Sequence, residues 1–409
     1  MKGGLYTKIL QKIAHFQEER PFLTVLIILI GTIIIYGGVA NVRTVASLEQ
    51  MMPKNIDEIK AFNDLRDINL GQDIIAIVVQ VDRESSDPHG VMSILDYRVF
   101  EYLLHLDNLL ESNSDIREIY TMSDVIITLN NNKVPSDEEY ELLISQPEVR
   151  KKLSNFVNQD FTNTIMIATT DVSADDSRMN LLTKKILKDI DSAGKPAGVK
   201  ISLTGTPLIQ QKLGEMIAKD RKSTQWISTL FVFIITMLVF RSVTSAIVPL
   251  TVVTISVNWL YGTMGYVNLP ISTLAGGVAA MVIGIGIDYA IHLMNKFKYE
   301  RKKHKDVTIK EAIELAVVDT GTALTATALT TISAFLAFLI GKMPEMGRFG
   351  ILMVIGVSYS LFFTVFGLPA LLVIEEKIIY YIKQKMRFGI EEEFKLVTEK
   401  EVEACETGK

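Results

Sequence analysis

Long apolar runs alternate with short polar loops over two parts of the chain. Five runs are apolar throughout, and another carries Thr224 and Gln225 in its first turn, followed by Trp226. Each run approaches the roughly 20 residues that a helix needs to cross the hydrocarbon core of a bilayer. The six predicted spans are Pro21–Ala40, Ser223–Phe240, Ser245–Val267, Pro270–Leu293, Ala312–Ile340 and Gly350–Ile374. This pattern predicts a membrane α-helical bundle.

The segment between the first two runs has shorter periods and predicts a separate α+β domain. Its strand-like stretches are Asp73–Val81, Ile116–Tyr120, Thr164–Thr169 and Val199–Leu203, and its helical stretches are Ile94–Leu110, Met179–Ile190 and Thr206–Lys222. The order strand, helix, strand occurs twice, which is typical of a ferredoxin-like fold. Pro135–Phe156 lies between the halves and predicts a helical insertion with Ser136 as its N-cap.

These patterns divide the chain into five parts. Residues 1–20 predict a helix on the membrane surface, because apolar residues recur at helical spacing opposite Lys8 and Lys12. Residues 21–40 form the first span, 41–222 the extracytoplasmic domain, 223–376 spans two to six, and 377–409 a tail.

Lysine and arginine concentrate in one set of short loops. Residues 1–20 hold four of them and residues 294–312 hold seven. Because basic loops stay in the cytoplasm, we expect a multi-pass protein of the cytoplasmic membrane with both termini inside and residues 41–222 outside.

Composition excludes several classes of function. The outer segment has more acidic than basic residues, which argues against nucleic-acid binding. Cys405 is the lone cysteine, so neither a disulfide framework nor a cysteine metal cluster is expected, and no other metal site or cofactor is predicted. The sequence has no phosphate-binding loop, nucleophile elbow or H-E-x-x-H motif, which indicates a non-enzymatic protein driven by an ion gradient.

Asp288 lies inside the fourth predicted span. An ionised carboxylate there costs on the order of 3 kcal/mol, so it must face protein or water. Desolvation favours the neutral acid and water favours the anion, so this group can take up and release a proton; a purely structural hydrogen-bonding role is the alternative. Small residues allow another helix to approach closely, and we expect such contacts at Gly277, Gly284 and Gly286.

Other polar residues near Asp288 are candidates for a proton relay. Tyr289 points about 100° away from Asp288. His292 shares its stripe and is either a relay or an interfacial histidine. The fifth span is rich in threonine, and most of these hydroxyls are expected to bond to their own backbone, with Thr330 and Thr331 contributing to a polar path. Asp319 is a second proton site or a residue facing water.

The stretch Gly284-Ile285-Gly286-Ile287-Asp288-Tyr289-Ala290-Ile291-His292-Leu293 resembles the fourth-span signature of the resistance-nodulation-division superfamily, in particular its MMPL-like and hydrophobe/amphiphile exporters. Thr204-Gly205-Thr206-Pro207 and Ala328-Leu329-Thr330-Thr331 are similar to further motifs of that family. The layout of one span, an outer domain and five spans matches half of a typical member.

This resemblance implies a proton-driven exporter of lipids or other hydrophobic molecules. It makes Asp288 the proton carrier and Tyr289 its hydrogen-bonding partner, and it makes the outer domain porter-like. Typical members contain two such halves, so a homodimer is the simplest expectation, with a partner chain or a longer protein as alternatives.

Two other functions remain open. One is a protein-export accessory, since secretion auxiliaries share the six-span layout and a fourth-span aspartate, although their motif differs. The other is a lipid or sterol sensor that transports nothing.

Overall fold

The computed structural model of the protein describes residues 5–44, 52–53, 56–57, 59–61, 64, 73–84, 87–173, 177–272, 274–303 and 307–381. The chain forms two compact units. The membrane unit comprises Met1–Thr44 and Ile217–Lys409, and the sheet unit comprises Val45–Met216. The predicted tail at 377–409 therefore lies outside the described residues from position 382 onward.

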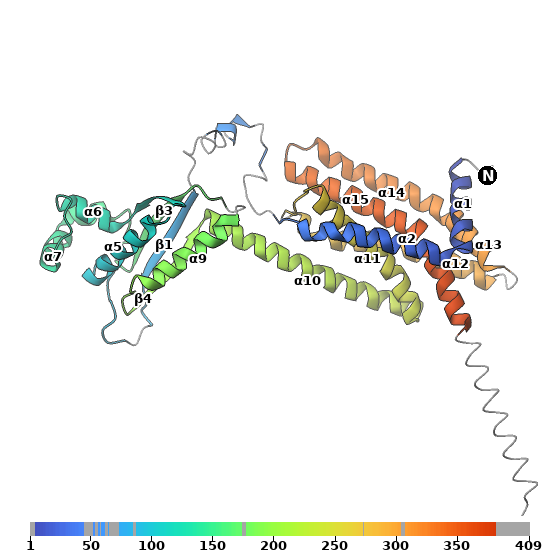
Figure 1. Ribbon diagram of the computed structural model, residues 1–409, viewed down its shortest axis with the longest axis horizontal. Coiled ribbons are helices and arrows are strands. Elements are labelled where there is room, and N and C mark those ends of the chain that lie inside the picture. The colour runs from blue at the N-terminus through green and yellow to red at the C-terminus, as the bar shows by residue number, and fades with distance from the viewer. Residues whose placement is uncertain are drawn as a thin grey trace, which may run out of the picture. The chain divides into compact units, whose positions relative to one another are not determined.

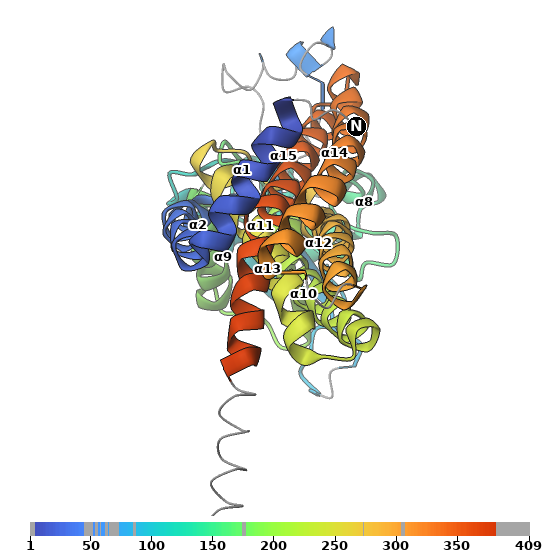
Figure 2. The same cartoon turned by 90° about the vertical axis from the view of Figure 1, so that its right-hand side faces the viewer.

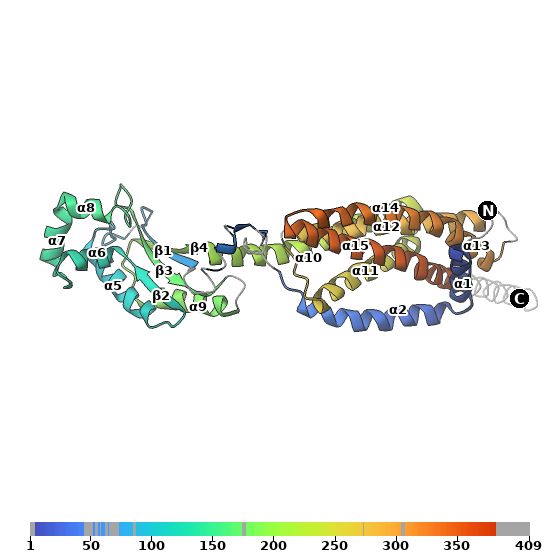
Figure 3. The same ribbon diagram turned by 90° about the horizontal axis from the view of Figure 1, so that it is seen from above.

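The sheet unit contains a four-stranded antiparallel sheet. Its strands, β1 (Asp73–Val81), β2 (Ile116–Tyr120), β3 (Asn163–Thr170) and β4 (Val199–Gly205), lie in the order β2-β3-β1-β4. Helices α5 (Tyr97–Glu111) and α9 (Ser177–Ser192) follow β1 and β3 and pack against each other on one face of the sheet (Figure 3). This is the ferredoxin-like arrangement, and the prediction made from the order of elements is confirmed.

Gly205 ends strand β4 and carries a backbone conformation that only glycine adopts easily. Its φ is +139°, and a Cβ added there would lie 2.2 Å from the carbonyl oxygen of Ile74 on the neighbouring strand. The following helix, α10 (Thr206–Phe240), starts at the next residue and crosses the boundary between the two units without a break. The Thr-Gly-Thr-Pro motif therefore encodes an abrupt change from strand to helix.

The insertion between β2 and β3 is larger than predicted and holds three helices. They are α6 (Met122–Leu129), α7 (Asp137–Ser145) and α8 (Pro147–Leu153). Ser136 caps α7 as predicted, and Glu139 closes a capping box with it. The predicted single helix is broken at Gln146 because Pro147 starts a new one and disfavours helical backbone in the residue before it. Helix α6 was not predicted from the sequence, although Thr121 and Asp124 form a capping box like that of α7.

Among the residues that the structure describes, the membrane unit has six helical segments long and apolar enough to span a bilayer, as predicted (Figure 1). Helix α1 (Leu5–Glu19) precedes them. The first three spans are α2 (Pro21–Tyr36) with η1 (Gly37–Asn41), then α10, then α11 (Val243–Tyr266). The fourth is η2 (Leu274–Gly277) with α12 (Val278–Lys303), the fifth joins α13 (Ile309–Leu315), η3 (Ala316–Thr320), α14 (Gly321–Leu336) and η4 (Ala337–Ile340), and the sixth is α15 (Pro344–Phe366). Helices α11, α12 and α15 contact one another at the centre, and α14 packs on α15.

The predicted span boundaries need three corrections. The fourth span begins as a short 3-10 turn at Leu274, not at Pro270. The fifth span is interrupted by a π-helical turn at Ala316–Thr320. The sixth span runs over Pro344–Phe366 and not Gly350–Ile374. Hydropathy missed its start because Glu345 and Arg348 lower the apolar average, although Glu345 is buried.

Helix α1 runs across one end of the bundle (Figures 2 and 3). It contacts α2, α13 and the π-helical turn. Its buried residues are Leu10, Ala14 and Gln17, whereas Leu5, Ile9 and Phe16 of the predicted apolar face are exposed. Helix α1 therefore packs against protein through a different face from the one predicted, and its position on the membrane surface stays a prediction.

Asp107 on α5 makes the stability of the sheet unit depend on pH. Burial, with Asp124 and Glu111 nearby, raises the pKa of Asp107 to about 6. The folded state binds this proton more tightly than the unfolded state, so stability decreases as pH rises from about 4 to about 6 and stays low above that. We expect Asp107→Asn to slow hydrogen exchange of residues 97–111 roughly fivefold at pH 7.5, or about 1 kcal/mol after allowing for partial exposure.

The same exchange experiment at pH 4.5 supplies the control for Asp107. There the carboxyl of the folded protein is largely protonated, so most of the penalty present at pH 7.5 is absent and the two proteins should differ much less in exchange rate. Glu101→Gln on the exposed side of the same helix should change neither profile. An equal effect of Asp107→Asn at both pH values would show that burial of the charge is not the cause.

Candidate functional site

Asp288 and His292 form a polar pair within the apolar part of α12. The His292 Nε2 atom lies 3.3 Å from the Asp288 Oδ1 atom, because residues four apart in a helix stand above one another. Their side chains are 66% and 61% exposed. Within the described part of the chain, no helix covers this pair.

The three glycines predicted at helix contacts have different surroundings. A Cβ on Gly286 would lie 2.8 Å from Ser360 Oγ and 3.3 Å from Val253 Cγ2, so this glycine allows α12 to approach α15 and α11. A Cβ on Gly277 or Gly284 would meet nothing within 4 Å. The stripe that carries Asp288 is thus open along this face of the chain.

Tyr289 is buried, on a side of α12 about 100° from the open stripe. Its side chain interacts with Thr331, although the geometry falls short of a hydrogen bond, and its hydroxyl has no hydrogen-bond partner among the described residues. The partner that Asp288 contacts is His292 and not Tyr289. The arrangement expected from the family resemblance, in which Tyr289 bonds to Asp288, is not the one observed within this chain.

The threonines of the fifth span bond mainly to their own helix. Thr330 donates to the Thr327 carbonyl at 2.7 Å, and Thr331 donates to the same carbonyl at 3.0 Å. Similar bonds to preceding carbonyls are made by Thr322, Thr325, Thr327 and Ser333. This agrees with the expectation that most of these hydroxyls satisfy their own backbone.

Asp319 belongs to an ionic cluster that was not predicted from the sequence. Its Oδ2 atom lies 3.2 Å from Lys296 Nζ, which also lies 2.9 Å from Glu300 Oε1. Asp319 belongs to the π-helical turn, whose wider backbone displaces the side chains from regular helical positions. The sequence did contain a signal for this cluster. Titratable residues recur every four positions, at Asp288, His292, Lys296 and Glu300, and this spacing places them in one row along α12.

This row places titratable groups at intervals along a helix that is otherwise apolar. Lys296 is eight residues beyond Asp288, or about 12 Å along the axis. The pair at 288 and 292 is exposed on the open stripe, whereas Glu300 is buried and Lys296 is mostly so. Such a row can hold and pass protons if water reaches it. No group of three or more metal-ligating side chains was found among the described residues.

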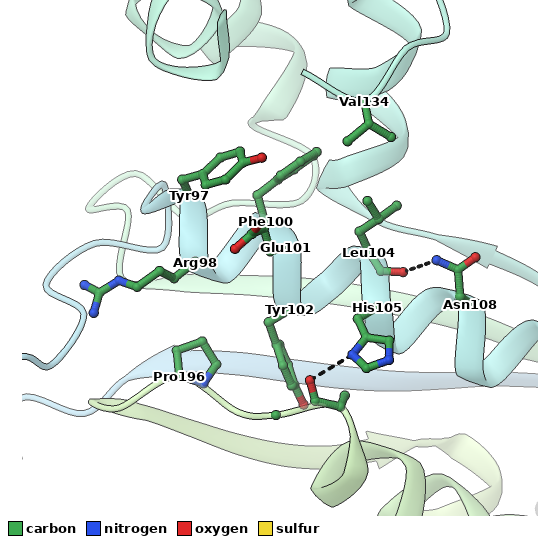
Figure 4. Close-up of a pocket in the computed structure, with 12 residues that line it drawn as sticks. Tyr97, Arg98, Phe100, Glu101, Tyr102, Leu104, His105, Asn108, Val134 and Pro196 are labelled. Carbon is green, nitrogen blue, oxygen red and sulfur yellow. Dashed lines mark hydrogen bonds between the residues drawn. The ribbon is translucent and has the colours of Figure 1, made fainter. Parts of the chain in front are cut away.

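The sheet unit has a pocket of its own beside α5. Its volume is about 620 Å³, and Figure 4 shows its aromatic and polar lining. Tyr102 donates to the Ile190 carbonyl at 3.3 Å, and His105 Nδ1 lies 3.2 Å from the Ala193 carbonyl oxygen. Arg98 is held by Asp96 and by the carbonyl of His89, and its guanidinium holds the pKa of Asp96 below its usual value. The pocket therefore combines aromatic surface with polar groups, of which Arg98, Tyr102 and His105 are already paired.

The bundle, its fourth-span carboxylate and the ferredoxin-like sheet define a membrane protein of the resistance-nodulation-division type. The chain belongs to the MMPL family, whose model matches residues 38–386. It is therefore a multi-pass membrane protein of a transporter family.

Two relatives differ greatly in length. The chain is 34% identical over 382 residues to the membrane protein MJ1562 of Methanocaldococcus jannaschii, and the match covers 93% of this chain and 97% of that protein. It is 25% identical over 272 residues to MmpL12 of Mycobacterium tuberculosis, named as a transport protein, and this match covers 61% of the chain and 23% of MmpL12. The chain is thus much shorter than MmpL12.

The fold is similar to that of the hedgehog release protein Disp from the water bear Hypsibius dujardini. The TM-score is 0.56 at 11% identity, and the match covers 90% of this chain and 49% of Disp. At this identity the likeness concerns the fold alone. The chain spans about half the length of that structure.

The ionic cluster around Lys296 predicts a specific loss of stability. Lys296→Met removes the cation that Glu300 and Asp319 share, so we expect the free energy of unfolding to fall by about 2 kcal/mol. Thermal unfolding of the purified protein in nanodiscs measures this change. The double variant Lys296→Met with Glu300→Gln should recover most of the loss, and Lys302→Met on the exposed surface is the matched control. No recovery in the double variant would contradict the assignment.

Proposed function

We propose that the protein is a half-size exporter of lipid-like or other amphiphilic molecules, driven by the proton gradient and acting as a homodimer. The observation that carries this proposal is the Asp288–His292 pair on an uncovered stripe of a membrane-spanning helix. Hydrocarbon is a poor environment for such a pair, so a polar, titratable stripe needs a protein or water partner. Membership of the MMPL family supports transport as the task.

In this proposal Asp288 carries the proton. The anion interacts favourably with a protonated His292, and protonation of Asp288 removes that attraction. The two charge states therefore favour different packing of α12 against its neighbours, which makes a two-state element that a proton gradient can bias. His292 and then Lys296, with Asp319 and Glu300, mark the polar route toward the end of α12 that carries Arg301, Lys302 and Lys303.

A second copy of the chain is the proposed cover for the open stripe. Gly277 and Gly284 leave room for a helix at close range, which suits a twofold contact between the two α12 helices. The two Asp288 carboxyls then face a shared interface and titrate as a coupled pair.

The sheet unit is proposed to handle the cargo outside the cell membrane. Its ferredoxin-like fold agrees with a porter domain, and the pocket beside α5 offers aromatic surface for an amphiphile. Helix α10 continues from the last strand of this unit into a membrane span, so it is the covalent route by which a change in the bundle reaches the sheet unit. Both termini are proposed to be cytoplasmic, in agreement with the distribution of lysine and arginine.

Proton flux tests the role of Asp288. Purified protein in liposomes of native lipid, under an imposed pH gradient, should admit protons, and Asp288→Asn should reduce the flux to that of empty vesicles because the amide keeps the shape but cannot titrate. Asp319→Asn should leave a measurable flux, since Asp319 lies beyond the carrier on the proposed route. Full flux through Asp288→Asn would exclude this mechanism.

Disulfide cross-linking tests the homodimer. In a background with Cys405→Ser, Gly284→Cys should cross-link two chains in the membrane, because position 284 lies on the proposed twofold contact. Ile30→Cys, on an exposed part of the first span, is the matched control and should stay monomeric on denaturing gels. Equal cross-linking at both positions would indicate random collision instead of a defined interface.

A further inference from the structure

An apolar cavity lies between the surface helix and two spans, separate from the Asp288 row. Its volume is about 380 Å³, and its walls come from α1, α2 and α15. The wall residues used below are Ile9, Lys12, Gln17, Ile28, Phe362 and Phe366. Nearly all of this lining is apolar, and the rings of Phe362 and Phe366 stack with centroids 4.6 Å apart. The volume falls in the range of ordinary small-molecule sites.

One wall of this cavity is formed by the last turns of helix α15. Helix α15 ends at Phe366, and the residue that would donate to the Val365 carbonyl four positions later is Pro369, which has no N–H. The side chain of Gln17 supplies the missing donor. Its Nε2 atom donates to Val365 O at 3.0 Å and to Phe366 O at 2.8 Å. Gln17 therefore ties α1 to the broken end of the last span.

This tie leaves one polar atom of Gln17 without a partner. The two bonds to carbonyls fix which end of the amide is nitrogen, so the oxygen is identified by elimination. Gln17 is 1% exposed, and its Oε1 atom has no hydrogen-bond partner among the described residues. A buried acceptor left unsatisfied costs roughly 1–3 kcal/mol, which reduces the net stabilisation that this tie provides.

Lys12 adds a positive charge to the same cavity. It lines the cavity one turn before Phe16 on α1, its side chain is exposed, and it forms no salt bridge with a described residue. The lysine stem can cover apolar surface while the ammonium group stays at the polar boundary of the bilayer. The cavity thus offers an apolar body with a cation beside it.

We propose that this cavity binds one acyl chain of an anionic phospholipid, taken from the leaflet beside α1. The chain occupies the space against Ile28 and Phe362, and the phosphate lies near Lys12. The bound lipid fastens α1 to the bundle. This site does not depend on the proposed export function, because it shares no residue with the Asp288 row.

Native mass spectrometry of the purified full-length protein tests the proposal. The protein is released from nanodiscs of phosphatidylcholine that contain a small fraction of phosphatidylglycerol, and the retained lipids are counted. We expect one retained phosphatidylglycerol per chain. Lys12→Ala should weaken its retention about tenfold, whereas Lys8→Ala, on the same helix but outside the cavity, should leave it unchanged.

A second pair of variants tests the cavity itself without disturbing the tie made by Gln17. Ile9 lines the cavity at its exposed edge, so Ile9→Trp should fill the entrance and abolish retention of the lipid. Leu5→Trp, which is more exposed and lies outside the cavity, is the matched control and should retain it. Circular dichroism of each variant checks that the fold is kept.

Two results would overturn this inference. Equal losses in Lys12→Ala and Lys8→Ala would mean that anionic lipid is attracted by the general positive charge of α1. Equal retention of phosphatidylcholine and phosphatidylglycerol would mean that the Lys12 cation does not select the lipid.

Discussion

The free-energy cost of a charged group in hydrocarbon determines how the membrane unit must be completed. Asp288 and His292 contact each other, but their side chains remain mostly exposed in a helix of bilayer-spanning length. Their mutual contact lowers the cost without removing it, because both groups still lose water on the open side. The chain as described is therefore stable in a membrane only if protein or water covers this stripe.

The need to cover Asp288 and His292 agrees with the positions of the glycines in the same span. Gly286 lets α12 approach the helices on one side, while Gly277 and Gly284 leave the other side open. The proposed partner, a second copy, makes use of both properties, because it covers the charge and brings two carboxyls together. Titration of such a pair then depends on how closely the two copies pack, which couples proton uptake to helix movement.

Much of the fold could be predicted from the sequence because its signals are local. Span length, strand patterning and the order of elements were sufficient for six spans and the ferredoxin-like sheet. The π-helical turn at Ala316–Thr320 and the three-helix insertion were missed, since both depend on tertiary packing or on caps that a hydropathy pattern does not record. The role of Gln17 could not be predicted either, because its partners lie about 350 residues away in the chain.

The candidate site was predictable only in part, because some of its signals are local in the sequence and others are not. Asp288 and His292 stand out as polar residues in an apolar run. Lys296 and Glu300 look in the sequence like ordinary members of a basic loop, and only the length of α12 shows that they continue the same row. Asp319 contacts Lys296 through a side-chain position that the π-helical turn sets and regular helix geometry does not.

A cryo-electron microscopy structure of the full-length protein in lipid nanodiscs would test the central claim most directly. The account predicts a twofold dimer in which the α12 helices meet along Gly277, Gly284 and Asp288, with both carboxyls shielded from lipid. A monomer whose Asp288 stripe faces acyl chains, or a dimer joined through another face, would contradict it.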